Sequence, residues 1–119
     1  MEQIGQLILT LLHGVTNTHI LHLQSQKYSE HIALGEFYNG LSDLVDQLVE
    51  SMQGKFQQIL TYPQEYIAPS ATGLQEVQEL STFFQQMRGA LPQDTEIQNV
   101  CDEIQTLMNS TIYKLTFLQ

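Results

Sequence analysis

The sequence has few basic residues. Of its 119 residues, four are Lys or Arg and 13 are Asp or Glu, which gives a formal net charge of −9. Charged residues make up only 14 % of the chain, against about 25 % in an average soluble domain, so the acidity comes from missing Lys and Arg. So few cations cannot neutralise a run of phosphates or dock the chain on anionic lipid. We therefore expect neither nucleic acid nor a membrane as a partner.

Cysteine and long apolar runs are also scarce. The single Cys101 excludes an intrachain disulfide and a multi-cysteine zinc site, and its apolar surroundings predict a small core residue. The longest apolar run, residues 7–12, is far shorter than the about 20 residues that span a bilayer. Glu2 is the only early charge, so the basic start of a secretory signal is missing. We expect one domain, residues 1–119, in a reducing cytoplasm.

Apolar residues recur at steps of three and four along almost the whole chain, as in amphipathic helices. Four helices are predicted, at about residues 2–25, 29–60, 74–89 and 95–117. Ser29 is the predicted N-cap of the second helix, and Thr72 with Gln75 fits a capping box for the third. Asp94 or Thr95 is expected to cap the fourth.

The connection between the second and third helices is predicted to be long, because residues 61–73 contain Pro63, Pro69 and Gly73. A short link makes neighbouring helices antiparallel, whereas a long one allows a crossover, as in ferritin-like bundles. The expected fold is therefore all-α, a ferritin-like four-helix bundle with a long crossover connection between helices 2 and 3. The pattern also allows a plain up-and-down bundle.

Metal-ligating residue types gather in the first half of the chain. All four histidines lie in the first 31 residues, at His13, His19, His22 and His31. The following helix carries Glu36, Asp43, Asp46 and Glu50. Imidazole and carboxylate together suit iron and other first-row metals, and carboxylates are costly to bury unless they are paired or bind a cation. Satisfied core histidines and a solvated carboxylate face fit the same pattern.

The spacing of these residues is more specific. His19 and His31 are twelve residues apart, Asp46 lies fifteen residues after His31, and Glu50 four further on. An aromatic residue, Tyr28, lies nine residues after His19. Over about residues 15–54, this order resembles the mini-ferritins of the Dps (DNA-protection-during-starvation) family, and in particular the short ferritin-like proteins of tailed bacteriophages.

The resemblance implies a metal site at a two-fold dimer interface, where His19 and His31 of one subunit face Asp46 and Glu50 of the other. Such a site would bind Fe(II) and oxidise it with peroxide or dioxygen, for iron sequestration or oxidative protection. Zinc and manganese are alternative metals. A homo-oligomer is implied, from a dimer up to a dodecameric cage, in the cytoplasm of a bacterium and with a phage as the source of the gene. DNA binding is not carried over, because the Lys-rich N-terminal tail is missing.

The sequence departs from the family at one ligand. The middle Asp of the family falls on Gly35, which has no side chain. The neighbouring Glu36 lies about 140° round a regular helix from His31, and we predict that a π-bulge near Gly35 brings it under that histidine. His22 and Asp43 are further candidate ligands, although His22 also fits a core histidine or a residue that supports a ligand.

The missing acid leaves an alternative function open. A weakened site on a retained scaffold would also suit a metal-free helical bundle that acts by binding, for instance a phage-encoded modulator of a host protein. An acidic DNA mimic is a third class, but 13 acids spread over the chain are too few for the dense carboxylate rows that such mimics need.

Overall fold

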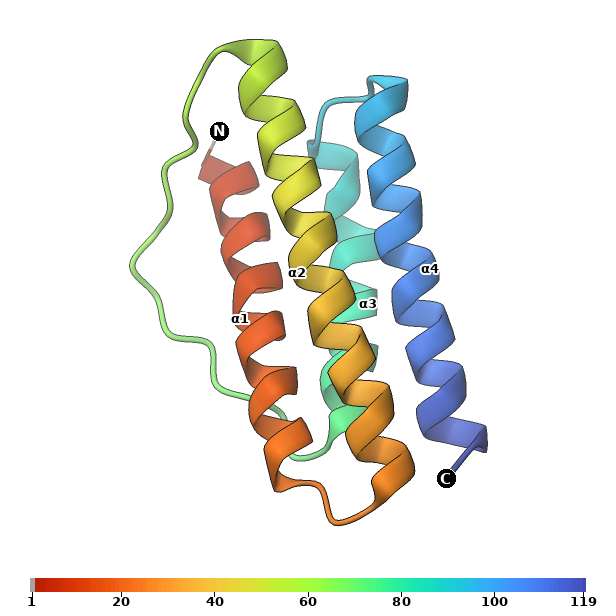
Figure 1. The fold of residues 1–119 in the computed structure, drawn as a ribbon. Helices are drawn as coiled ribbons and strands as arrows, with labels where there is room; N and C mark the ends of the chain where they lie inside the picture. Colours follow the sequence, from red (N-terminus) through yellow and green to blue (C-terminus); the bar gives the residue numbers. More distant parts are fainter. Residues whose placement is uncertain (1) are drawn as a thin grey trace.

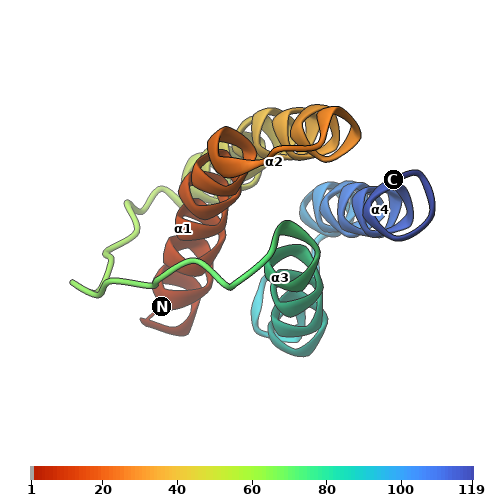
Figure 2. The same cartoon turned by 90° about the horizontal axis from the view of Figure 1, so that it is seen from below.

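The computed structural model describes residues 2–119, which form an all-helical bundle with no strand (Figure 1). Its elements are α1 (Glu2–Gln24), α2 (Tyr28–Phe56), α3 (Gly73–Met87), the 3-10 turn η1 (Arg88–Ala90) and α4 (Thr95–Phe117). Helix α1 packs against α2 and α3, and α4 packs against the same two helices (Figure 2). The prediction of four helices in an all-α chain is confirmed. No helix in the described range is both long and apolar enough to cross a membrane.

The core follows the apolar spacing of the sequence, and α2 supplies a large share of it. Its fully or almost fully buried side chains recur at steps of three and four, at Leu34, Phe37, Leu41, Val45, Leu48 and Met52. Cys101 lies in the same core on α4 with no exposed surface, as predicted. Burial raises the pKa of its thiol, which keeps the sulfur protonated and unreactive.

The segment between α2 and α3, residues 57–72, is here called the strap. Helix α2 has 29 residues and is therefore about 43 Å long. The strap leaves the far end of α2 and passes along the outside of α1 to the start of α3 at the other end of the bundle (Figure 1). Sixteen residues reach at most about 53–58 Å when fully extended, so the strap has little slack and no room for a helix.

Both ends of the strap are fixed by backbone hydrogen bonds to side chains. At its start, Gln57 adopts the left-handed conformation (φ 53°, ψ 44°) and turns the chain out of α2. The N–H of Leu60 then donates to Gln53 Oε1 at 2.9 Å. At its end, the N–H of Ser70 donates to the buried Glu76 at 2.8 Å. These bonds pair amides that have no partner in a ladder or helix.

The middle of the strap lies directly on α1. Asn17, only 2 % exposed, donates from Nδ2 to the carbonyl oxygen of Ile67 at 3.1 Å. At Gly5 the two backbones approach so closely that a Cβ atom would lie 2.0 Å from the carbonyl oxygen of Thr61. The absence of a side chain at Gly5 therefore sets how close the strap can come.

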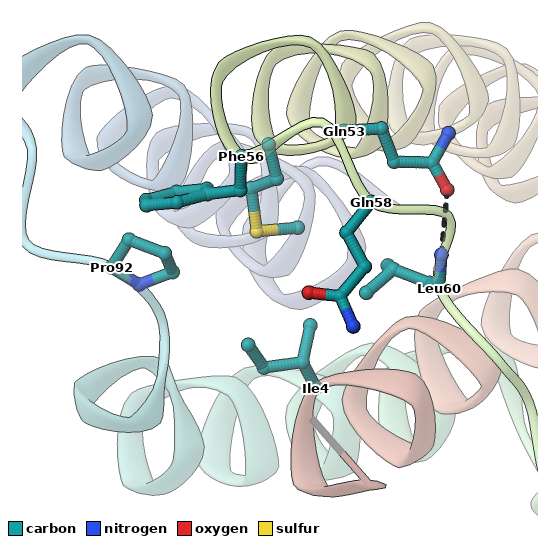
Figure 3. A pocket seen from close by; sticks show the side chains of 7 residues that line it. Ile4, Gln53, Phe56, Gln58, Leu60 and Pro92 are labelled. Carbon is teal, nitrogen blue, oxygen red and sulfur yellow. Dashed lines mark hydrogen bonds between the residues drawn. The ribbon is translucent and has the colours of Figure 1, made fainter.

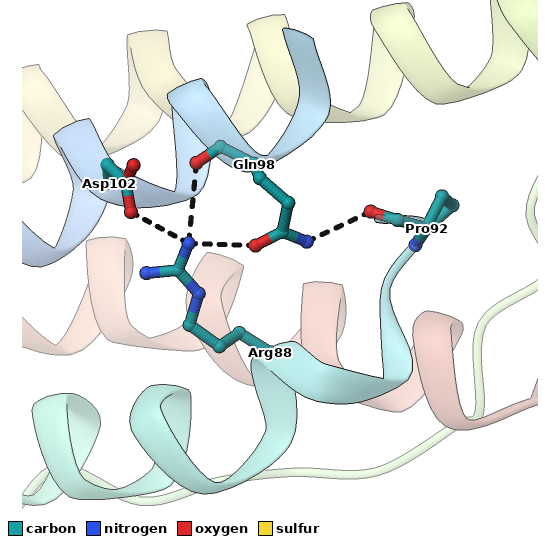
Figure 4. A network of polar contacts seen from close by, with 4 residues as sticks. All are labelled: Arg88, Pro92, Gln98 and Asp102. Carbon is teal, nitrogen blue, oxygen red and sulfur yellow. Dashed lines mark hydrogen bonds and ion pairs between the residues drawn. The ribbon is translucent and has the colours of Figure 1, made fainter. Parts of the chain in front are cut away.

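Polar contacts join α3 and α4 at the end where η1 turns the chain (Figure 4). Nη2 of Arg88 lies 2.8 Å from Gln98 Oε1 and 2.9 Å from Asp102 Oδ1. Gln98 in turn donates from Nε2 to the carbonyl oxygen of Pro92 at 2.9 Å. Arg88 thus holds the first turns of α4 beside the end of α3.

The observed helix ends correct some sequence predictions. Helix α2 ends at Phe56, not near residue 60, and Ile59 is 75 % exposed although it continues the apolar spacing. Helix α3 ends at Met87, directly before η1, rather than at residue 89. Helix α2 ends early because Gln57 adopts the left-handed conformation, and α3 ends early because the chain changes to 3-10 geometry at Arg88.

The predicted caps also had mixed outcomes. Thr72 caps α3 as predicted, accepting from the N–H of Gln75 at 3.1 Å. Ser29 as a cap is wrong, because α2 begins one residue earlier and Lys27 holds the N-cap position. Asp94 holds the N-cap position of α4, but its carboxylate binds Lys55 instead of the helix. That contact raises the pKa of Lys55 and lowers that of Asp94.

We predict opposite effects for two Gly→Ala substitutions. Gly5→Ala should lower the free energy of unfolding by about 1–3 kcal/mol, because the new methyl group must push the strap away from α1. Gly54→Ala, in an exposed stretch of α2 with nothing within 4 Å of its Cβ position, should raise it by about 0.5–1 kcal/mol through helix propensity. Urea denaturation of both variants measures the two values. Equal effects would contradict the close approach at Gly5.

Candidate metal-binding face

Two histidines join the end of α1 to the start of α2. The rings of His22 and His31 are stacked, with centroids 3.7 Å apart and planes 17° apart. His22 Nδ1 lies 2.5 Å from the carbonyl oxygen of His31, and His31 Nδ1 lies 2.9 Å from the carbonyl oxygen of His22. A carbonyl oxygen only accepts, so each Nδ1 carries the hydrogen. In the neutral rings both Nε2 atoms therefore keep a lone pair, the form that binds metals.

Gly35 makes room for this pair. A Cβ atom at Gly35 would lie 3.0 Å from Cε1 and 3.2 Å from Nδ1 of His22. The Dps-type proteins that the sequence resembles carry an Asp at this position. Here an imidazole ring from α1 covers it. A larger residue would have to displace that ring.

The predicted π-bulge near Gly35 is wrong. Helix α2 is a regular α-helix throughout Tyr28–Phe56. Glu36 lies on the exposed surface, where its Oε2 is 3.0 Å from Nζ of Lys114 on α4. Glu36 is therefore not placed beneath His31, and its charge is already paired.

Two more rings extend the histidine pair into what is here called the imidazole cluster: His19, His22, His31 and Tyr38. The exposed His19 ring stacks on Tyr38, with centroids 4.1 Å apart and planes 13° apart. Tyr38 meets His22 edge-on at 5.3 Å. Tyr38 was not predicted as a site residue, although its position seven residues after His31, two helical turns on, places it on the same face. The fourth histidine, His13, lies outside the cluster, with Nδ1 3.0 Å from the carbonyl oxygen of Leu9.

Tyr28 plays no part in this cluster. It is 80 % exposed at the start of α2. Its spacing from His19 matches the family, but its side chain extends into solvent.

The predicted carboxylate ligands lie further along α2. Asp43, Asp46 and Glu50 are exposed, and within residues 2–119 none of them forms an ion pair or side-chain hydrogen bond. On a regular helix, Asp46 and Glu50 lie only about 60° and 100° round from His31, so all three share one outward face. Along the axis, however, Asp46 is about 22 Å from His31.

One subunit therefore does not bring the predicted ligands together. The histidines lie at one end of the face and Asp46 with Glu50 lie towards the other. In the part of the chain that the structure describes, no group of three or more His, Cys, Asp or Glu is close enough to hold a metal ion. What a single chain presents is two separate groups of candidate ligands on one face.

Comparisons with known proteins give a family but no function. Residues 22–115 match the sequence model of a family described as a family of unknown function (DUF5856). The match covers most of the chain, including α2, α3 and nearly all of α4, and the chain belongs to this family. No curated protein and no solved structure matches the chain.

We predict that His22 and His31 are in the Nδ1–H tautomer when neutral, because both Nδ1 atoms face carbonyl oxygens. Long-range ¹⁵N–¹H correlation spectra of the histidine rings, recorded above their titration range, distinguish the two tautomers. His19, which has no such carbonyl partner, serves as the internal comparison. Nε2–H signals for His22 and His31 would contradict the hydrogen bonding described above.

Proposed function

We propose that the chain is a ferritin-like, Dps-type protein that binds and oxidises Fe(II) at a site shared between two subunits. One observation carries the proposal: His31, Asp46 and Glu50 share an outward face of α2, but Asp46 lies about 22 Å and Glu50 about 28 Å from His31 along the helix. The strap supports the ferritin-like reading of the fold, since it returns the chain along the bundle between α2 and α3, as a crossover requires (Figure 1).

A two-fold axis would complete the site. Placed halfway between His31 and Asp46, near Tyr38 and Asn39, the axis sets two α2 helices antiparallel and exchanges their ends. The histidines of one subunit then face Asp46 and Glu50 of the partner, and symmetry makes two such sites per dimer. Larger cages, up to a dodecamer, would need further contacts between such dimers.

The surface between the two half-sites suits a close approach. Gly35, Asn39 and Ser42 lie on the same face between His31 and Asp46, and all have small side chains. Exposed apolar side chains of α1, Leu12 and Leu23, flank the face and would be covered by a partner. This combination favours helix-to-helix packing between two copies.

The donor set fits iron as the substrate. Imidazole Nε2 atoms and carboxylate oxygens bind Fe(II), and carboxylates also stabilise Fe(III). The hydrogen bonds of the two Nδ1 atoms to carbonyl oxygens are the kind of support that orients metal-binding histidines. The net charge of −9 raises the local concentration of cations. In this role the protein would sequester iron or remove oxidant in the cytoplasm.

One ligand of the family is missing from this donor set. Gly35 supplies no carboxylate, and Glu36 is paired with Lys114. We propose that His22 takes that place in the half-site, with its Nε2 atom as the donor, and that Asp43 is an auxiliary carboxylate. A donor set richer in nitrogen also suits Zn(II), whereas Mn(II) prefers carboxylates, so both metals belong in a competition experiment.

A metal-free interaction protein is the second candidate. It is favoured by the contacts between His22 and His31. Each ring donates a hydrogen bond to the other residue's carbonyl oxygen, and the two rings stack, so the pair has a structural role in joining α1 to α2. On this reading the same face binds another protein, as a phage-encoded modulator of a host protein would.

We predict that the purified chain oxidises Fe(II) faster than buffer when oxidant is added, measured by the ultraviolet absorbance of the ferric product. His19→Ala/His31→Ala should lower the rate by at least about tenfold, because imidazole ligands are lost. Glu36→Gln is the matched control: it removes an exposed carboxylate of the same helix outside the proposed site and should leave the rate unchanged. Light scattering of each sample gives the oligomer mass.

A mixing experiment tests the sharing of the site. His19→Ala/His31→Ala lacks one half-site and Asp46→Asn/Glu50→Gln the other, so each alone should be inactive. Equal amounts, unfolded and refolded together, should recover about one quarter of the wild-type rate, because half of the random dimers are mixed and each has one of two sites intact. If light scattering shows a monomer, or if the wild type oxidises Fe(II) no faster than buffer, the ferroxidase proposal is wrong and the metal-free candidate is favoured.

A further inference from the structure

A small apolar cavity lies at the end of the bundle opposite the imidazole cluster (Figure 3). It has a volume of about 180 Å³, and its apolar lining comes from four different parts of the chain, at Ile4, Met52, Phe56, Leu60 and Pro92. Two glutamines, Gln53 and Gln58, complete the wall, and no charged side chain among residues 2–119 lines it.

The cavity results from how the helices end. Gln57 turns the chain out of α2, so the strap bridges across to α1 instead of continuing the helix. The bond from Leu60 N–H to Gln53 Oε1 holds the strap in this path and leaves Leu60 6 % exposed (Figure 3). Pro92 follows η1 and forms the opposite wall.

The cavity is formed before any ligand enters and is open at one side. Met52, at 3 % exposed, belongs to the core cluster, whereas Phe56 at the mouth is half-exposed. The Gln53 oxygen that reaches the strap is already paired with Leu60 N–H. What the cavity offers a ligand is therefore almost entirely apolar contact.

We propose that this cavity binds a small, uncharged, apolar molecule about the size of a single aromatic ring. In another protein, an apolar cavity of about 150 Å³ takes up benzene, so this one has room for a ring of that size. A charged ligand would lose its hydration without gaining a partner. The flexible thioether of Met52 can adapt to the ring and makes favourable sulfur–aromatic contacts. The site is distinct from the proposed iron site, because Met52 faces the core whereas Glu50, two residues earlier, lies on the exposed outward face of α2.

Benzene and benzoate are suitable probes, since they share a ring and differ in charge. The full chain is labelled at its methionine methyl groups and titrated with each compound while ¹³C–¹H spectra are recorded. Benzene should shift the Met52 methyl signal saturably and leave that of Met108, which is fully buried elsewhere in the core, in place. Benzoate should produce no saturable shift.

Three variants place the binding in the cavity. Ile4→Phe fills it and should weaken benzene binding at least about tenfold, because the added ring atoms occupy the space that benzene needs. Ile59→Phe adds the same atoms at a residue that is 75 % exposed and outside the lining, and should bind as the wild type does. Phe56→Ala, which widens the exposed mouth without crowding the core, should also weaken binding.

Several results would overturn the proposal. No saturable shift at Met52, an equal shift with benzoate, or an equal shift at Met108 would each do so. If the two single variants, Phe56→Ala and Ile4→Phe, both bind benzene at full strength, benzene binds outside this cavity. If Ile4→Phe fails to fold, as shown by its helical circular dichroism, full-strength binding in Phe56→Ala overturns the proposal on its own.

Discussion

The length of α2 is the constraint on which the rest of the structure depends. A helix of 29 residues carries the chain from one end of the bundle to the other, and α3 starts back at the first end (Figure 1). The strap must cover that distance with few residues to spare, so it stays extended and cannot bury its backbone in a helix of its own. Its hydrogen-bond partners therefore come from the helices: Asn17 of α1 donates to its middle, Gln53 of α2 accepts from its start and Glu76 of α3 accepts from its end.

This constraint also decides which faces remain free. Helix α1 is enclosed by α2, α3 and the strap, so only its outer stripe, with His19 and Leu23, stays exposed. That stripe adjoins the outward face of α2, and the two together form the broad surface on which the proposed half-sites lie. At the opposite end, the departure of the strap from α2 opens the apolar cavity. Both candidate sites thus follow from how the chain returns along α1.

Local patterns in the sequence predicted what depends on near neighbours. The steps of three and four give the helices and their buried faces, and Thr72 with Gln75 gives a cap. The end of α2 was missed because Ile59 continues the apolar spacing, while the turn at Gln57 depends on the strap. The partner of Glu36 was missed because Lys114 is 78 residues away in the chain. The helical repeat relates residues within one helix, so it cannot predict a contact between residues on two different helices.

The same limit applies to the candidate site. The four-residue spacing of Asp46 and Glu50 is typical of neighbours on one helix face, and a regular α2 agrees with it. It did not predict that His22 and His31 bind each other's backbone, since that depends on how the chain turns between α1 and α2. Nor did it show that Gly35 is needed for the His22 ring. The glycine at position 35 thus lets a histidine from another helix occupy the space where a side chain would lie.

The strap has one more consequence, for the covalent organisation of the fold. It joins two helical hairpins, α1 with α2 and α3 with α4, whose buried faces meet in a single core. Its exposed tyrosines, Tyr62 and Tyr66, make it the natural place for a protease to nick the chain. Apart from Leu60, the buried hydrophobic residues that join the hairpins lie outside the strap, nearly all of them on the helices, so the two pieces would remain associated after such a cut. The two hairpins thus pack against each other as two different subunits would, with one extended segment joining them.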